Sequence, residues 1–143
     1  MPAFRNIFTF AHCSGLSAAG LVHHLPVNAA RASVGPRIRV VLSDGTIVMG
    51  PGKADLLAAV ASSGSIRSAA AELEMSYMRA WSLIRVMNEA FQTPLVEKVR
   101  GGADKGGARL TVRGRRVLQL YRRMERDARR AIAAAAREIL AEL

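Results

Sequence analysis

Apolar and polar positions change their spacing several times along the chain, and each change predicts a different element. Residues 1–36 show no sustained periodicity, so we expect an unstructured tail there. A run of β-forming residues follows over 38–49, and the turn sequence Ser43-Asp44-Gly45-Thr46 interrupts it. Because an Asp-Gly turn between two apolar runs is typical of a β-hairpin, the segment 38–49 is predicted to form one.

Helical spacing begins after a Gly-Pro-Gly break and continues through three predicted helices. The first covers about 53–61 and places its large apolar residues on one face. The second covers about 65–73 and begins at Ser65, a residue type that caps helix N-termini. The third covers about 76–91, has Ser76 as its N-cap, and ends before a proline that cannot supply the amide hydrogen of a continuing helix.

The last part of the chain predicts a strand, a loop, a second strand and a long helix. The strands are expected at 95–99 and 109–110, the loop at 100–108, and the helix at about 111–142, with Thr111 as its N-cap. The complete order is β-β-α-α-α-β-β-α. We therefore predict a mainly α fold with small β-hairpins, in which residues 37–143 form a winged helix-turn-helix domain with a long C-terminal dimerisation helix.

The predicted helix 76–91 separates its residues into two faces at about 100° per residue. One narrow stripe, flanked by Tyr77, Leu83 and Trp81, is expected to be buried: Ala80, Ile84, Met87 and Phe91. The opposite side carries Met78, Ser82, Arg85 and Glu89, with Arg79 and Val86 at its edge. An α-helix fits the major groove of B-DNA, where arginine can make a bidentate contact with guanine. The alternative is an ordinary amphipathic helix with a solvated basic face.

The loop after the first predicted strand of the wing combines basic residues with glycine. Lys98, Arg100, Lys105 and Arg109 surround four glycines at 101, 102, 106 and 107. Such a loop is suited to lie along phosphates or in a minor groove, and a simply mobile loop is the alternative. A phosphate-binding P-loop is excluded because no Gly-Lys-Ser/Thr follows at the required spacing.

The predicted final helix has an apolar seam at alternating steps of four and three residues. The seam consists of Val117, Tyr121, Met124, Ala128, Ala131 and Ala135. This spacing is the one by which two helices pair, and about 30 residues would span about 45 Å, longer than so small a domain requires. We therefore expect a homodimer, which would present two recognition helices to two half-sites of an inverted repeat.

Charge then narrows the choice of partner. The chain has 21 Lys and Arg residues against 11 Asp and Glu, a net charge of +10. Such an excess favours a polyanion, and nucleic acid is preferred over an anionic membrane surface. No stretch approaches the roughly 20 uninterrupted apolar residues of a membrane span. A single cysteine, Cys13, excludes a disulfide framework and fits a cytoplasmic location.

Candidate metal ligands gather only in the N-terminal tail. They are His12, Cys13, His23 and His24, and their spacing matches no recognised metal site. The sequence suggests no Ser-His-Asp set and no pair of carboxylates for acid–base work. We therefore expect no enzyme activity, no metal and no cofactor.

Several motifs between Arg37 and Arg130 resemble the DNA-binding domain of ModE-type regulators, which are molybdate-responsive transcriptional regulators of bacteria. They are Ser62-Ser63-Gly64-Ser65-Ile66, Ala69-Ala70, Met75-Ser76-Tyr77, Ala80-Trp81, Met87-Asn88, Pro94-Leu95-Val96-Glu97-Lys98, the glycine wing, Leu110-Thr111 and Gly114-Arg115. LysR-type regulators are similar more loosely, since they lack the leading hairpin. The resemblance implies a sequence-specific regulator of transcription that binds double-stranded DNA.

The resemblance and the helix faces together define the predicted DNA-binding residues. They are Ser65, Arg67, Ser76, Tyr77, Met78, Arg79, Ser82, Arg85, Lys98, Arg100, Lys105 and Arg109. ModE-type regulators also carry a C-terminal molybdate-binding region, whereas this chain ends with its helix, so molybdate binding is not expected. The alternative function is a non-specific or architectural nucleic-acid binder, in which the same cations only track phosphates.

Overall fold

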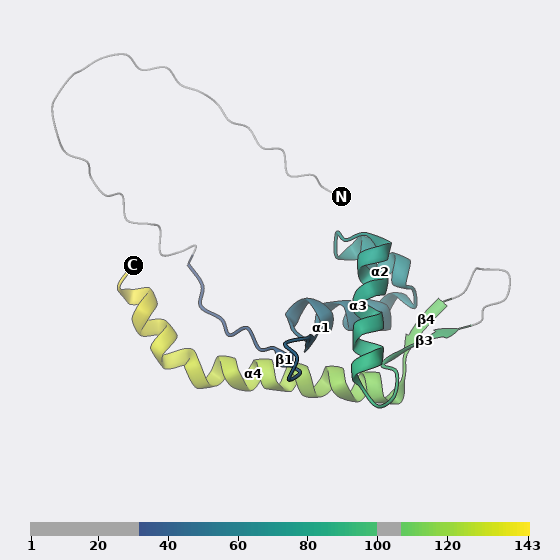
Figure 1. The fold of residues 1–143 in the computed structure, drawn as a ribbon. Coiled ribbons are helices and arrows are strands. Elements are labelled where there is room, and N and C mark those ends of the chain that lie inside the picture. Colours follow the sequence, from purple (N-terminus) through teal and green to yellow (C-terminus); the bar gives the residue numbers. More distant parts are fainter. Residues whose placement is uncertain (1–31, 100–106) are drawn as a thin grey trace, which may run out of the picture.

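A computed structural model describes residues 32–99 and 107–143 of the chain. The unstructured tail was predicted for residues 1–36. Residues 1–31 of that segment lie outside the described residues, and residues 32–36 have no regular secondary structure. The elements are β1 (Val40–Val41), β2 (Ile47–Met49), α1 (Pro51–Ser63), α2 (Ile66–Glu72), α3 (Tyr77–Ala90), β3 (Val96–Val99), β4 (Gly107–Leu110) and α4 (Val112–Ala141). The predicted order and the mainly α fold with two small hairpins are confirmed (Figure 1).

The first hairpin pairs β1 with β2 in antiparallel register and turns at the predicted Asp-Gly sequence. Asp44 accepts the N–H of Thr46 on Oδ1 at 2.8 Å, and this hydrogen bond lowers the pKa of the Asp44 carboxyl. Gly45 has a φ of +85°, a conformation that other residues adopt only at a cost. The turn thus directs Val48 and Met49 into the core.

Helix α1 forms the centre of the domain. It is longer than predicted at both ends because Pro51 at the N-terminus needs no amide partner, and Gly64 provides a left-handed C-cap with φ +66°. Its buried side consists of Ala54, Leu56, Leu57, Ala59 and Val60. Helices α2 and α3, the base of the β3–β4 pair and the first turns of α4 pack around this side.

The wing, defined here as the antiparallel pair β3 and β4, is attached to the end of α1. The N–H of Ala108 donates to the carbonyl of Gly64 at 2.8 Å. Gly107 pairs with Val99 of β3 and so belongs to the strand rather than to the loop, and a Cβ on it would approach that same carbonyl to 3.0 Å. β4 therefore begins at Gly107, two residues before the predicted start of the strand.

Helix α4 is anchored through its first turn. Thr111 caps it as predicted, accepting the N–H of Gly114 on Oγ1 at 2.9 Å and donating the same hydroxyl to the carbonyl of Pro94 at 2.8 Å. A Cβ on Gly114 would lie 2.1 Å from the carbonyl oxygen of Leu95. Only glycine permits this close approach between helix and strand.

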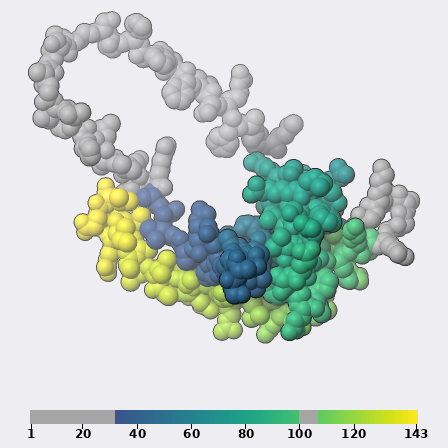
Figure 2. Space-filling view, in the orientation of Figure 1, coloured from purple at the N-terminus to yellow at the C-terminus, as the bar shows by residue number. Residues whose placement is uncertain are grey.

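Further along, α4 is held to α1 by an ion pair and to the segment before β1 by a tyrosine. Arg122 donates to Asp55 of α1 at 2.5 Å and to Glu125 at 2.8 Å, and these two carboxylates raise the pKa of the guanidinium, Asp55 most of all. The hydroxyl of Tyr121 donates to the carbonyl of Ile38 at 2.7 Å. Burial, and then the charge of Glu125, raises the pKa of that phenol. The segment before β1 consequently lies across the middle of α4 (Figures 1 and 2).

Candidate nucleic-acid interface

Helices α2 and α3 are joined by a turn of only four residues, 73–76, whose backbone groups are paired locally. At the end of α2, Met75 donates to the carbonyl of Ala70 at 2.9 Å and Glu74 to that of Ala71 at 3.2 Å. This is the Schellman pattern, and it requires a left-handed residue at Glu74, which has φ +52°. The turn sets the direction in which α3 leaves the domain.

Both helices of the pair begin at the predicted serine caps. Ser65 accepts the N–H of Ser68 on Oγ at 3.4 Å, and Ser76 accepts the N–H of Arg79 at 3.2 Å. Two of the predicted interface residues therefore shape the helix ends. As at any helix N-terminus, the first turns of both helices also contain amide hydrogens that have no partner within the helix.

The two faces of α3 agree with the prediction. Ala80, Ile84 and Met87 are buried against the core, and Phe91 is half-buried against it. The outward side carries exposed Met78, Arg79, Ser82 and Arg85. With its inner side anchored, α3 presents a basic, hydrogen-bonding surface over its N-terminal half and centre, as an element that enters a DNA groove must.

Two arginines near this surface lie over aromatic rings of α3. The guanidinium carbon of Arg67, on α2, lies 5.5 Å from the ring centroid of Tyr77, and that of Arg85 lies 5.8 Å from the ring centroid of Trp81. Both distances fall within the range of a cation–π contact. Tyr77 and Trp81 are 41% and 36% exposed, so these rings belong partly to the surface.

Asn88 ties α3 to the wing. Its Oδ1 accepts the N–H groups of Leu95 at 2.8 Å and Val96 at 3.1 Å, while its Nδ2 donates to the carbonyl of Val96 at 2.8 Å. One side chain thereby fixes the distance between the exposed face of α3 and the start of β3. The outward side of α3 and the wing are thus joined through one side chain.

The structure describes two of the predicted wing cations, Lys98 and Arg109, and brings Lys98 next to Arg85. Lys98 of β3 and Arg85 of α3 line one hollow of about 310 Å³, together with Trp81. Arg109 of β4 donates from Nε to Glu97 at 2.8 Å. Arg100 and Lys105, which were also predicted to contact DNA, lie outside the described residues.

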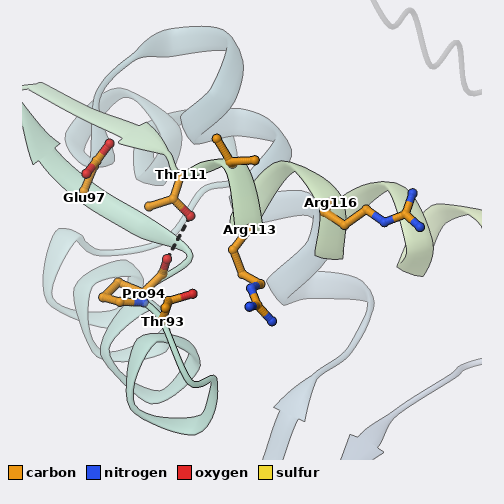
Figure 3. A pocket seen from close by; sticks show the side chains of 7 residues that line it. Thr93, Pro94, Glu97, Thr111, Arg113 and Arg116 are labelled. Carbon is orange, nitrogen blue, oxygen red and sulfur yellow. Dashed lines mark hydrogen bonds between the residues drawn. The ribbon is translucent and has the colours of Figure 1, made fainter.

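A second hollow, of about 560 Å³, opens beside the first turn of α4 and is lined in part by Arg113 and Arg116 (Figure 3). Thr111 and Pro94 meet at its edge through their hydrogen bond. Within residues 32–99 and 107–143 no group of three or more His, Cys, Asp or Glu side chains could hold a metal ion. None of the helices in that part of the chain is long and apolar enough to cross a membrane.

The predicted dimer seam on α4 divides into two parts. Tyr121 is 2% exposed and Val117 is half-buried, both against the core of their own domain. Met124, Ala131 and Ala135 are exposed, and Ala128 is half-buried. The seam as predicted is therefore not one continuous free surface, because its first two residues already hold α4 to the domain.

Sequence reasoning missed the roles of three residues. The prediction contains Asn88 only as part of a motif, Trp81 as part of a motif and as a flank of the buried stripe, and Glu74 only as a residue between the helices predicted at 65–73 and 76–91. The first two act through contacts across elements, which periodicity does not reveal. The third has a sequence signal, since a tight turn between two capped helices usually needs a left-handed residue.

The capped helix pair, the exposed basic face of the second helix and the attached β-hairpin together define a winged helix-turn-helix module. Comparison with known families agrees: residues 53–115 match the model of the bacterial regulatory helix-turn-helix proteins of the lysR family. This part of the chain is therefore similar to the helix-turn-helix domain of LysR-type regulators.

Individual relatives extend the comparison. The chain is 40% identical over 96 residues to the molybdenum transport protein ModE of Azotobacter vinelandii. The aligned region covers 67% of this chain and 33% of that protein. It is 44% identical over 71 residues to the DNA-binding transcriptional dual regulator ModE of Escherichia coli K12, covering 50% of this chain and 27% of the relative. It is 38% identical over 86 residues to the molybdenum-pterin-binding protein MopB of Rhodobacter capsulatus, covering 60% and 32%.

These matches confirm the resemblance to ModE-type regulators that the sequence motifs indicate. The chain spans about a third of the length of the curated relatives it matches.

Proposed function

We propose that this protein is a DNA-binding transcription regulator that recognises a specific double-stranded sequence through α3. The observation that carries the proposal is the division of α3 into a buried side, with Ala80, Ile84 and Met87, and an outward side with Arg79 and Arg85. The outward side is basic, and the wing cation Lys98 lines a hollow next to it. The names of two relatives, a transcriptional dual regulator and a transcriptional regulator, support the same function.

Selection of bound sequences from random DNA tests the proposal. A recovered motif should bind the purified protein at least about 1,000-fold more tightly than scrambled DNA at physiological salt, the lower limit for specific recognition. Arg79→Ala or Arg85→Ala should each weaken binding to that motif by about 1–3 kcal/mol if it contacts a base. Arg137→Ala, which alters an exposed arginine far along α4, is the matched control.

The non-specific alternative predicts a different pattern. If the protein only tracks phosphates, selection returns no motif, and the arginine variants weaken all sequences equally while reducing the salt dependence. That outcome would reject sequence-specific regulation and favour an architectural role.

We propose further that the protein acts as a homodimer on an inverted repeat, with α4 as the pairing helix. Support comes from the second half of α4: between Arg126 and Ala141, a stretch described in full, no residue is buried within the subunit. Apolar side chains nevertheless continue along the side of α4 that Tyr121 occupies, namely Ala128, Ile132, Ala135 and Ile139. An apolar stripe that leaves its own domain suits a second copy of the same helix.

Two alanine positions of α4 provide a matched test of the dimer. At about 100° per residue, Ala135 lies within about 40° of the direction of Tyr121, whereas Ala133 lies about 120° away. Both are exposed in the subunit. Ala135→Glu should dissociate the dimer in analytical ultracentrifugation, and Ala133→Glu should leave the sedimentation coefficient unchanged. A monomeric wild-type protein, or equal behaviour of both variants, would contradict pairing through this stripe.

A further inference from the structure

Three residues at spacing four form one stripe along α3: Tyr77, Trp81 and Arg85. The guanidinium of Arg85 lies 5.8 Å from the centroid of the Trp81 ring. Trp81 is 36% exposed, a large exposed fraction for a tryptophan beside the buried face of a helix. Its ring therefore serves partly as a surface on which Arg85 rests.

A carboxylate contacts Arg85 from the next turn of the helix. The Oε1 of Glu89 lies 3.9 Å from Nε of Arg85, and both side chains are exposed. Trp81 and Glu89 thus flank one arginine within a single stretch of helix. All three residues line the hollow of about 310 Å³ between α3 and β3, which Lys98 lines from the strand.

We propose that Trp81 is a positioning residue of the DNA-reading surface, which holds the guanidinium of Arg85 ready for a base edge. This inference rests on the proposed function. A cation–π contact is made with the face of the ring and uses none of the N–H donors of the guanidinium as a hydrogen bond. The contact therefore restricts the long side chain without consuming the donors that read guanine. Because part of the ordering cost is met before binding, Arg85 contributes more to affinity than a freely rotating arginine would.

The contact between the two residues can be measured without DNA. Trp81 is the only tryptophan of the chain, so intrinsic fluorescence reports on it alone. Arg85→Ala should change the emission spectrum of the free protein, whereas Arg79→Ala, which removes a neighbouring exposed arginine, should leave it unchanged. Identical spectra for wild type and Arg85→Ala would overturn the proposal.

A double-mutant cycle then tests the consequence for recognition. Binding to the motif selected by the wild type is measured for Trp81→Leu, Arg85→Ala and the double variant, each checked for folding by circular dichroism. The two substitutions should be coupled by about two- to five-fold, the range of an exposed cation–π contact, and Trp81→Phe should lose less affinity than Trp81→Leu. A parallel cycle between Trp81 and Arg79 should show no coupling.

The outcomes separate the two proposals. A wild-type protein that selects no motif rejects the proposed function, while the fluorescence comparison still reports on the Arg85–Trp81 contact. A wild-type protein that selects a motif, with strictly additive effects of Trp81 and Arg85, rejects only the positioning role. If Trp81→Leu does not fold, the cycle is made with Trp81→Met, which also removes the aromatic face, so that additivity has the same meaning.

Discussion

Asn88 connects the proposed DNA-reading helix α3 to the start of β3, and its replacement by alanine gives a quantitative prediction. The substitution removes hydrogen bonds to the N–H groups of Leu95 and Val96 and to the carbonyl of Val96. Leu95 is fully buried and Val96 nearly so, so water cannot readily replace the lost partner. Three net contributions of about 0.5–1.5 kcal/mol each amount to about 1.5–4.5 kcal/mol.

The better helix propensity of alanine offsets part of this loss, by about 0.5 kcal/mol. We therefore expect Asn88→Ala to lower the free energy of unfolding by about 1–4 kcal/mol. Urea denaturation followed by circular dichroism measures this quantity. Ser82→Ala, at an exposed position of the same helix, is the propensity control and should change stability by no more than about 0.5 kcal/mol.

The consequence for DNA binding follows from the same contacts. Without Asn88 the wing is no longer held to α3, so folded Asn88→Ala should bind the selected motif more weakly even though the residue itself is half-buried behind the surface. A stability loss below about 0.5 kcal/mol, the range of ordinary surface substitutions, would refute this account of how α3 and the wing are joined.

Two other backbone positions give predictions of opposite sign. Glu74→Gly should raise the free energy of unfolding by about 0.5–1 kcal/mol, because Glu74 has φ +52°, a conformation that glycine adopts at less cost. The control Glu72→Gly, inside α2, should lower the free energy of unfolding by about 1 kcal/mol. Urea denaturation of both variants measures the two changes. Gly114→Ala should lower the melting temperature and cost about 3 kcal/mol, since the new Cβ would lie 2.1 Å from the carbonyl of Leu95. Gly52→Ala, where a Cβ meets nothing within 4 Å, should be neutral or stabilising, and a tolerated Gly114→Ala would contradict the close approach.

Features encoded within a few residues of one another were predicted well from the sequence. The three N-caps Ser65, Ser76 and Thr111, together with the Asp-Gly turn of the first hairpin, were expected and are present. The buried stripe of α3 was also correct. Each depends on spacing along one element, and such spacing can be read directly from the order of residues.

The predicted dimer seam illustrates where that reasoning stops. Tyr121 has the spacing of a residue that pairs with a second helix, yet it lies in the core of its own domain and donates to Ile38. An apolar stripe is required in both situations, so periodicity alone cannot distinguish a partner subunit from the same subunit. Gly107 shows the same limit, since a glycine in a glycine-rich segment was assigned to the loop although its pairing with Val99 places it in a strand.

The order of residues by itself determined the number and order of the elements, the helix caps and the outward side of α3. Only the tertiary structure decided that Asn88 fastens the wing, that Arg122 joins α4 to Asp55 of α1, and that Arg85 rests on Trp81. The physical reason is the range of the interactions. Caps, turns and helix faces arise between near neighbours in the chain, whereas the position of one element against another depends on side chains that meet only after the chain has folded.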